Sequence, residues 1–419
     1  MQRNYFLVAL ILLIFFVISF LTNIIGPLVP EIIEDFKLSL TLVALLPFAF
    51  FIAYGVMSIP SGMLIERYRE KKVMISGFFV AFAGALLFAL FPNYLVAVIS
   101  LFLIGSGMAM LQVAINPLLR EAGGEENFAF NSVLGQLCFG LASFLSPLVY
   151  SYLVLNLGSG DPANFLLAGL DAIVPDELPW ISLYWLFALI SLVMVAVIMA
   201  SKIPEVELKE DEKVGALEIH MELLKNPVVL LFFLGIFCYV GSEQGVANWI
   251  SEFLSQYHGY DPQTTGASTV SWFWGMMTAG TLLGLLLLKI IDSRKVLILF
   301  AGGALISLTL ALFGSGEVAL YAFPAIGFLC AVMWPVIFSL ALNSVTEHHG
   351  SFSGILVTGI VGGAVIPLVI GSLGDLFGLR YGMLFLYLSF GYILSVGFWA
   401  EPLVSNKTID FGSQPATEQ

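Results

Sequence analysis

Charge is what this sequence has least of. Only 11% of its 419 residues are Asp, Glu, Lys or Arg, whereas 59% are hydrophobic. A soluble globule of this length carries about 25% charged residues, and so few polar side chains would not cover its surface. A soluble enzyme or binding domain is therefore excluded, and the lipid bilayer is expected to surround most of the chain.

Cysteine, histidine and basic residues are also scarce. Cys138, Cys238 and Cys330 lie inside apolar runs without paired spacing, which argues against disulfides and a metal site. The four histidines fall in predicted loops or at span ends, so they form no convergent catalytic set. Sixteen scattered basic residues within a net charge of -13 argue against nucleic-acid binding. We expect no catalysis, no cofactor and no resident metal.

Long apolar runs are what the sequence has instead. A bilayer-spanning helix needs about 20 mostly apolar residues, and runs of that kind recur along the whole chain. The first run is too long for a signal-peptide core and lacks a cleavage site. These runs predict an all-α membrane protein of twelve transmembrane helices. The predicted spans are 6–29, 40–65, 73–91, 94–119, 128–155, 180–200, 228–254, 265–290, 296–314, 318–342, 352–376 and 381–399.

Basic residues are distributed unequally between the two sides of these spans. With the N-terminus inside, only Lys37 and Arg380 fall outside. The basic residues predicted to lie inside are Arg3, Arg67, Arg69, Lys71, Lys72, Arg120, Lys202, Lys209, Lys213, Lys225, Lys289, Arg294, Lys295 and Lys407. Positive residues concentrate on the cytoplasmic side of membrane proteins. The asymmetry predicts a multi-pass protein of the plasma (inner) membrane with both termini in the cytoplasm.

A charged stretch divides the spans six and six. We expect an N-terminal six-helix bundle at 1–201, a cytoplasmic linker at 202–226, a C-terminal six-helix bundle at 227–404 and a disordered tail at 405–419. Lys-Val-Met-Ile at 72–75 recurs as Lys-Val-Leu-Ile at 295–298, and the spans opening at Phe130 and Phe352 both close on Pro-Leu-Val. Halves of six spans share one orientation, which is the parallel repeat of carriers that bind substrate between their halves.

Polar residues deep inside spans are candidate site residues, because a charged one at a helix centre costs about 2.5 to 3.5 kcal/mol. Glu243, near the middle of the seventh span, is the only carboxylate far from a predicted span end. It could hold a proton, coordinate Na+ or another cation, or accept sugar hydroxyls, and we assign it to cation coupling. The alternative is a protonated side chain bonded to a neighbouring helix.

Amides and indoles suit a neutral, hydroxyl-rich substrate. Amides both donate and accept hydrogen bonds, and indoles stack on the apolar faces of sugar rings. Trp272 and Trp274 are two residues apart and point to opposite faces, so at most one of them can face a central cavity. We prefer Trp272, which shares its face with Ser268. The alternatives are interhelical bonding for the amides and lipid-facing positions for the indoles. The candidate substrate-binding residues are Asn23, Gln112, Asn116, Gln136, Gln244, Asn248, Trp249, Trp272 and Trp334.

The loop after the second span carries a recognisable pattern. Residues 62–72 read Gly-Met-Leu-Ile-Glu-Arg-Tyr-Arg-Glu-Lys-Lys, which resembles the loop signature of the major facilitator superfamily. Asp292 and Arg294 lie in a weaker echo in the second half. The resemblance implies that Glu66, Arg67, Asp292 and Arg294 form a charge network that closes the cytoplasmic side. Ordinary positive-inside anchoring is the alternative.

Longer stretches resemble the fucose, glucose and galactose permeases within that superfamily. They are Asn-Pro at 116–117 with Gly-Gly-Glu at 123–125, Phe-Cys-Tyr-Val-Gly at 237–241, Trp-Pro-Val-Ile-Phe-Ser-Leu at 334–340 and Gly-Ile-Val-Gly-Gly at 359–363. The resemblance implies a monomeric symporter that works by alternating access. Its expected substrate is a monosaccharide, either a hexose, a deoxyhexose or an N-acetylhexosamine, carried with H+ or Na+.

The sequence departs from that branch at two positions. Fucose permeases place a proton-carrying Asp late in the first span and a Glu four residues before the fourth-span Asn-Pro, where this chain has Gly26 and Gln112. Neither residue titrates, so the proton route of that branch cannot be carried over and Glu243 is the only mid-span carboxylate left for coupling. This departure favours sodium coupling or uncoupled facilitation. A sugar uniporter and an exporter of another small polar solute remain alternatives, and a transporter-derived sensor is a third.

Overall fold

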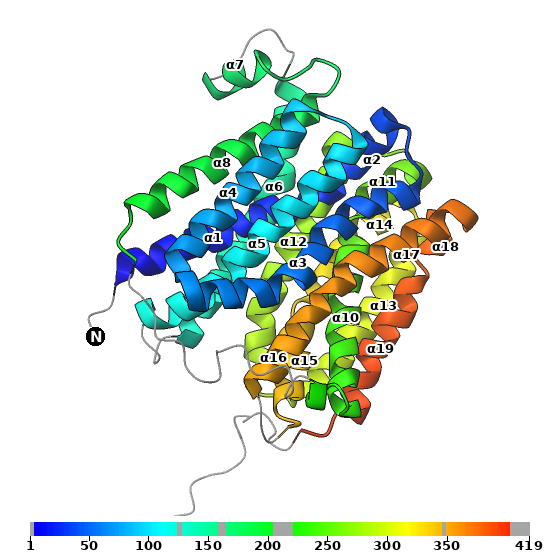
Figure 1. The fold of residues 1–419 in the computed structure, drawn as a ribbon. Coiled ribbons are helices and arrows are strands. Elements are labelled where there is room, and N and C mark those ends of the chain that lie inside the picture. Colours follow the sequence, from blue (N-terminus) through cyan, green and yellow to red (C-terminus); the bar gives the residue numbers. More distant parts are fainter. Residues whose placement is uncertain (1–3, 124–127, 158–164, 204–220, 346–348, 403–419) are drawn as a thin grey trace, which may run out of the picture.

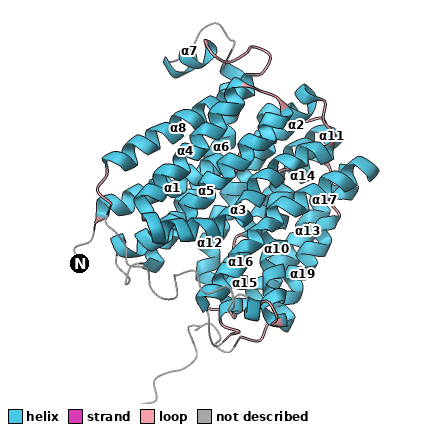
Figure 2. Ribbon diagram, viewed as in Figure 1, coloured by secondary structure: helices cyan, strands magenta, loops and turns pink. Residues whose placement is uncertain are grey.

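A computed structural model describes residues 4–123, 128–157, 165–203, 221–345 and 349–402, and these form helices and their connecting loops with no strand (Figures 1 and 2). Long apolar runs leave the backbone no partner in lipid except itself, which makes helices the stable solution. Polar caps begin several of them. Asn4 accepts a hydrogen bond from the Leu7 amide (3.1 Å), and Asn226 accepts one from the Val228 amide (2.9 Å).

The described residues of the first half form nine helical segments. Within it α1 packs against α6, while α5 lies against α3 and α4, and α8 lies against α4. In Figure 1 these segments run from blue through cyan to green. The segments are α1 (Tyr5–Thr22), α2 (Ile25–Phe36), α3 (Leu40–Tyr68), α4 (Glu70–Leu90), α5 (Tyr94–Gly123), α6 (Phe128–Asn156), α7 (Phe165–Asp171), η2 (Pro179–Ile181) and α8 (Ser182–Ala200).

The second half is built in the same way. Within it α10 packs against α17 and α19, and α14 lies against α12 and α13. Figure 1 shows it beside the first half, coloured from green to red. The segments are α10 (Pro227–Ala247), α11 (Ile250–His258), η4 (Pro262–Gly266), α12 (Ala267–Leu287), α13 (Ser293–Phe313), α14 (Gly316–Cys330), α15 (Met333–Leu342), α16 (His349–Thr358), η5 (Gly359–Val361), α17 (Gly362–Phe377), α18 (Leu379–Gly382) and α19 (Phe385–Trp399).

The halves meet chiefly along α3 with α17, α6 with α12, and α2 with α11. Glycines allow the close approach. A Cβ atom on Gly371 of α17 would lie 2.6 Å from the carbonyl oxygen of Leu40, and one on Gly26 of α2 would lie 2.4 Å from that of Ala247. Both distances are shorter than a carbon–oxygen contact allows, so this packing requires glycine.

Two spans are broken at related positions. The first is interrupted at Asn23 and Ile24 between α1 and α2, and the seventh at Asn248 and Trp249 between α10 and α11. The two asparagines are 225 residues apart (248 minus 23), close to the offset of the sequence repeat. Interrupted helices leave backbone polar groups available near the membrane midplane, where carriers place their substrate sites.

The predicted fold class is confirmed as an all-α membrane protein of two helical bundles. Eleven stretches of described residues are long and apolar enough to cross a membrane. The predicted eighth span, at 265–290, corresponds to the 21-residue α12, which is not among those eleven. Most of the predicted linker and all of the predicted tail lie outside the described residues, so the domain boundaries stay predictions.

Candidate functional site

Glu243 lies on α10 and is half-buried, and both of its carboxylate oxygens accept hydrogen bonds. The Tyr239 hydroxyl, one helical turn earlier, donates to Oε2, and the Gln244 amide nitrogen donates to Oε1 (3.2 Å). Among the residues that the structure describes, no Lys, Arg or His pairs with Glu243. A carboxylate held by neutral donors, without a fixed cation, can gain or lose a proton or an ion as part of a transport cycle.

Aromatic rings adjoin the carboxylate. The ring of Tyr239 lies 6.0 Å from that of Trp334 on α15, at an angle of 58°. Trp334 in turn stacks on Phe338 with centroids 5.9 Å apart. Trp334 itself is half-buried. An indole next to a hydrogen-bonding carboxylate has the chemistry that a sugar ring requires.

Gln244 on α10, and Asn248 and Trp249 in the break that follows it, are buried. Gln244 packs against Gly363 of α17, because a Cβ atom added to that glycine would lie only 3.2 Å from the Gln244 Cγ atom. The same position faces Phe51 of the first half. Within the described residues, the Asn248 amide nitrogen and the Trp249 ring nitrogen are buried without a hydrogen-bond partner. Buried donors of this kind are costly unless a ligand or water satisfies them.

The candidates in the first half have mixed surroundings. Asn23 is buried, and its amide nitrogen donates to the Ser143 hydroxyl on α6 (2.9 Å), which leaves its oxygen able to accept. Gln112 is half-buried on α5, and Gln136 is exposed on α6. The side chain of Asn116 lies outside the part of the chain that is described.

The two tryptophans of α12 differ as their spacing predicts. Trp272 is 54% exposed and meets Phe144 of α6 edge-on, with centroids 5.6 Å apart. Trp274 is buried and packs against Phe273 within the second half. Trp272 is therefore the indole at the boundary between halves, and its role in binding stays a prediction.

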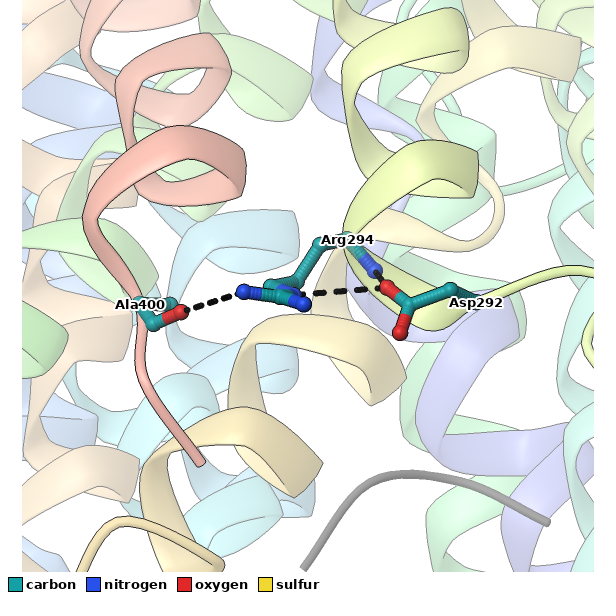
Figure 3. A network of polar contacts seen from close by, with 3 residues as sticks. All are labelled: Asp292, Arg294 and Ala400. Atoms are coloured by element: carbon teal, nitrogen blue, oxygen red, sulfur yellow. Dashed lines mark hydrogen bonds and ion pairs between the residues drawn. The ribbon is translucent and has the colours of Figure 1, made fainter. Parts of the chain in front are cut away.

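The predicted gating charges lie at the opposite end of the spans from Asp375. The Arg294 guanidinium pairs with Asp292 (3.4 Å) and donates to the carbonyl oxygen of Ala400 (3.4 Å), as Figure 3 shows. These contacts tie α13 to the end of α19 within one half. Arg67 is exposed and lies over the Tyr68 ring, and the side chain of Glu66 is outside the described part. A gating role for the four charges stays a prediction.

Hydrogen bonds join the two halves at the end predicted to be external, which we call the outer end. The carboxylate of Asp375 on α17 accepts bonds from the backbone amides of Leu40 (2.8 Å) and Thr41 (2.9 Å) at the start of α3. The Gln263 side chain donates to Glu31 of α2 (2.8 Å). These hydrogen bonds hold the two halves together at the outer end.

Sequence reasoning missed Tyr239, Asp375 and Glu31. Tyr239 precedes Glu243 by four residues, a spacing that places both on one helix face, so this signal was available. Asp375 falls at the end of the predicted span 352–376, and Glu31 lies just beyond the predicted span 6–29. Their partners lie hundreds of residues away in the chain, and no local pattern identifies such pairs.

The family model described as Major Facilitator Superfamily matches residues 11–366, most of the chain. The chain belongs to this superfamily. Its members are transporters, so the expectation that the chain is not an enzyme is confirmed, as is the family resemblance.

Two curated relatives and one solved structure resemble this major facilitator protein. The glucose/galactose transporter of Brucella abortus is 32% identical over 411 residues, 94% of each chain. The L-fucose-proton symporter of Escherichia coli is 25% identical over 397 residues, 90% of this chain and 89% of the relative. A crystal structure of the transporter FucP in the outward conformation matches with a TM-score of 0.67 at 23% identity, covering 94% of this chain and 98% of that one. The structural match shows that the fold is shared.

Proposed function

We propose that this chain imports a monosaccharide together with a cation by alternating access between two six-helix bundles. The observation that carries the proposal is the arrangement around Glu243, a carboxylate in mid-span held by the neutral donors Tyr239 and Gln244 beside the indole of Trp334. A carboxylate at this depth in the membrane carries a considerable cost in free energy, and such residues mark functional sites.

The sugar class is supported by the relatives and by the donor chemistry. Relatives named for glucose, galactose and fucose cover most of the chain. Gln244, Asn248, Trp249 and Trp334 supply amides and indoles close to Glu243, and Asn23 supplies an amide oxygen from the first half. We assign substrate binding to these residues together with Gln112, Asn116, Gln136 and Trp272.

Glu243 explains how a cation and a sugar move together. An uncompensated carboxylate at mid-span resists exposure to a lower dielectric, so the empty, charged carrier reorients poorly. Cation binding removes that charge, and a bound sugar completes the hydrogen bonds of Gln244 and Asn248. The fully loaded carrier therefore reorients most readily.

The same proposal places the chain in the cell membrane as a monomer with both termini in the cytoplasm. The bundles span 1–201 and 227–404, joined by a cytoplasmic linker at 202–226. The hydrogen bonds of Asp375 and Glu31 at the outer end fit a carrier that is open toward the cytoplasm. In the outward-open conformation these bonds break, and Glu66, Arg67, Asp292 and Arg294 close the other side.

Uptake into proteoliposomes tests the proposal. Purified protein is reconstituted and given labelled glucose, galactose, fucose, mannose or N-acetylglucosamine, with and without inward gradients of H+ or Na+. We expect one gradient to drive accumulation of one or more of these sugars, and Glu243→Gln to exchange sugar without accumulating it. Absence of sugar movement under every condition would refute the proposed function.

A further inference from the structure

Two polar side chains at the break of the seventh span are buried without a hydrogen-bond partner. Asn248 and Trp249 follow the end of α10 at Ala247, and only 5% and 1% of their surfaces are exposed. Over the described residues, neither the Asn248 amide nitrogen nor the Trp249 ring nitrogen finds an acceptor. A buried donor without an acceptor carries a desolvation penalty, which a bound oxygen atom removes. Two neighbouring donors in this state are suited to a ligand that carries oxygen.

This break lies where the two halves of the molecule meet. A Cβ atom on Gly26 of α2 would lie 2.4 Å from the carbonyl oxygen of Ala247 and 3.3 Å from the Cα atom of Asn248. The backbone of the first half therefore packs directly on the break in the second half. Carriers built from two parallel halves bind their substrate between the halves, near the membrane midplane. The two donors are thus placed beside the path of a transported solute.

Gln244 can supply the acceptor that a hydroxyl at this place also needs. The backbone amide of Asn248 donates to the Gln244 carbonyl oxygen (3.0 Å), so the helical turn continues through Asn248. Side chains four residues apart lie on one face of a helix, which puts the two amide side chains next to each other. The Gln244 amide nitrogen donates to Glu243 (3.2 Å), which leaves its side-chain oxygen able to accept. Two donors and one acceptor therefore gather at the break.

We propose that Asn248 and Trp249 are specificity-determining residues that recognise one hydroxyl of the sugar. A hydroxyl oxygen has two lone pairs, which accept hydrogen bonds from the two buried donors, and its own hydrogen is donated to the side-chain oxygen of Gln244. The hydroxyl and all three protein groups are then satisfied. This proposal rests on the proposed function and deepens it, because it states which feature of the monosaccharide the carrier selects.

A deoxy sugar is rejected at this subsite because it leaves polar groups unpaired. Without the hydroxyl, both donors lack an acceptor when the carrier closes over its substrate and excludes water. A site built to bond a substrate hydroxyl rejects the analogue that lacks it far more strongly than an apolar pocket rejects an added group. The Trp274 ring nitrogen is also unpartnered within the described residues, but that indole packs against Phe273 inside the second half. Trp274 therefore serves as a comparison for an indole outside the subsite.

Competition by deoxy sugars tests the subsite in the wild-type carrier. Proteoliposomes take up labelled glucose against unlabelled glucose or one of the four derivatives that lack a single hydroxyl at C2, C3, C4 or C6. Galactose and its derivatives replace this set if galactose is taken up faster. We expect one derivative to compete about 100-fold more weakly than the parent sugar and the others to stay within about tenfold. Equal competition by all four would overturn the subsite while leaving sugar import intact.

Asn248→Leu and Trp249→Phe test the two donors, with Trp274→Phe as the matched control. Each test variant lacks one donor, so the parent sugar loses a hydrogen bond while the rejected derivative no longer leaves that donor unpaired. The ratio of their inhibition constants should fall from about 100 to about 10 in either variant and stay at about 100 in Trp274→Phe. Both constants come from the same vesicles, so the ratio does not depend on the amount of folded carrier. An unchanged ratio in either variant would overturn the role of that residue.

Discussion

Asp375 caps a helix of the other half of the molecule. Its two carboxylate oxygens accept the backbone amides of Leu40 and Thr41, the first residues of α3. Ser39 accepts a third amide of the same turn, from Leu42 (3.3 Å). An anion at a helix N-terminus satisfies amides that have no intrahelical partner and interacts favourably with the helix dipole. Because α3 and α17 belong to different halves, this cap stabilises closure of the outer end.

Removing the cap should favour the outward-open conformation. In Asp375→Ala the lost interaction amounts to about 1 kcal/mol at an exposed helix end, or roughly fivefold in the conformational equilibrium. A cysteine at Ala44, buried where α3 meets α17, reports opening when the three native cysteines are replaced. We expect Asp375→Ala to speed its labelling by an impermeant maleimide about fivefold.

The matched control is Glu317→Ala. Glu317 is also an acid in the first turn of a helix, but that helix, α14, lies wholly within the second half. Its loss should leave labelling at the Ala44→Cys position unchanged. Equal labelling rates in wild type and Asp375→Ala would contradict the role assigned to the cap.

The bond between Gln263 and Glu31 is a second, separate contribution to outer closure. Gln263→Ala should raise the labelling rate of the same cysteine by a few fold, because a hydrogen bond to a charged partner is lost. Combined with Asp375→Ala, the two effects on the conformational free energy should add, since the pairs share no partner. A double variant that labels no faster than either single variant would show that the two contacts do not act independently.

Gln244 should contribute to sugar affinity. Gln244→Ala removes an amide beside Glu243 and should raise the KM for sugar about tenfold, equivalent to 1.4 kcal/mol. Ser242→Ala is the control, because that neighbouring hydroxyl bonds Ser389 inside the second half. The measurement is initial uptake rate against sugar concentration, and an unchanged KM in Gln244→Ala would remove Gln244 from the binding site.

Trp334 should be the indole that stacks on the sugar. Trp334→Ala should raise KM about tenfold and Trp334→Phe by less, because an aromatic face contributes about 0.5 to 1.5 kcal/mol beyond its buried area. Trp274→Phe serves as the comparison, since that indole is buried against Phe273. If Trp334→Ala binds sugar as well as Trp274→Phe does, the stacking assignment fails.

Hydropathy alone predicted most of the fold. The predicted spans fall on the observed helical segments to within a few residues at most ends, because membrane crossing requires apolar runs of a fixed length. The breaks at Asn23 and Asn248 escaped prediction, since hydropathy reports side-chain polarity and not the pattern of backbone hydrogen bonds. The first span, formed by α1 and α2, also extends to Phe36, seven residues beyond its predicted end at residue 29.

The candidate site was predictable where single residues stand out chemically. Glu243 was found because a carboxylate in mid-span is rare, and its partners Tyr239 and Gln244 lie on the same helix. The cap formed by Asp375 was not predictable, because it depends on how two helices from different halves pack. The sequence likewise offers no reason for Gly26, whereas the structure shows Ala247 where any larger side chain would lie.

The account depends most on Glu243 as the group that couples a positive charge to a neutral sugar. Sugar-concentration jumps applied to proteoliposomes on a solid-supported membrane record charge movement directly. We predict a sugar-induced inward current in wild type and no such current in Glu243→Gln, with sugar exchange retained in both. A current of equal size in Glu243→Gln would contradict the assignment of coupling to this residue.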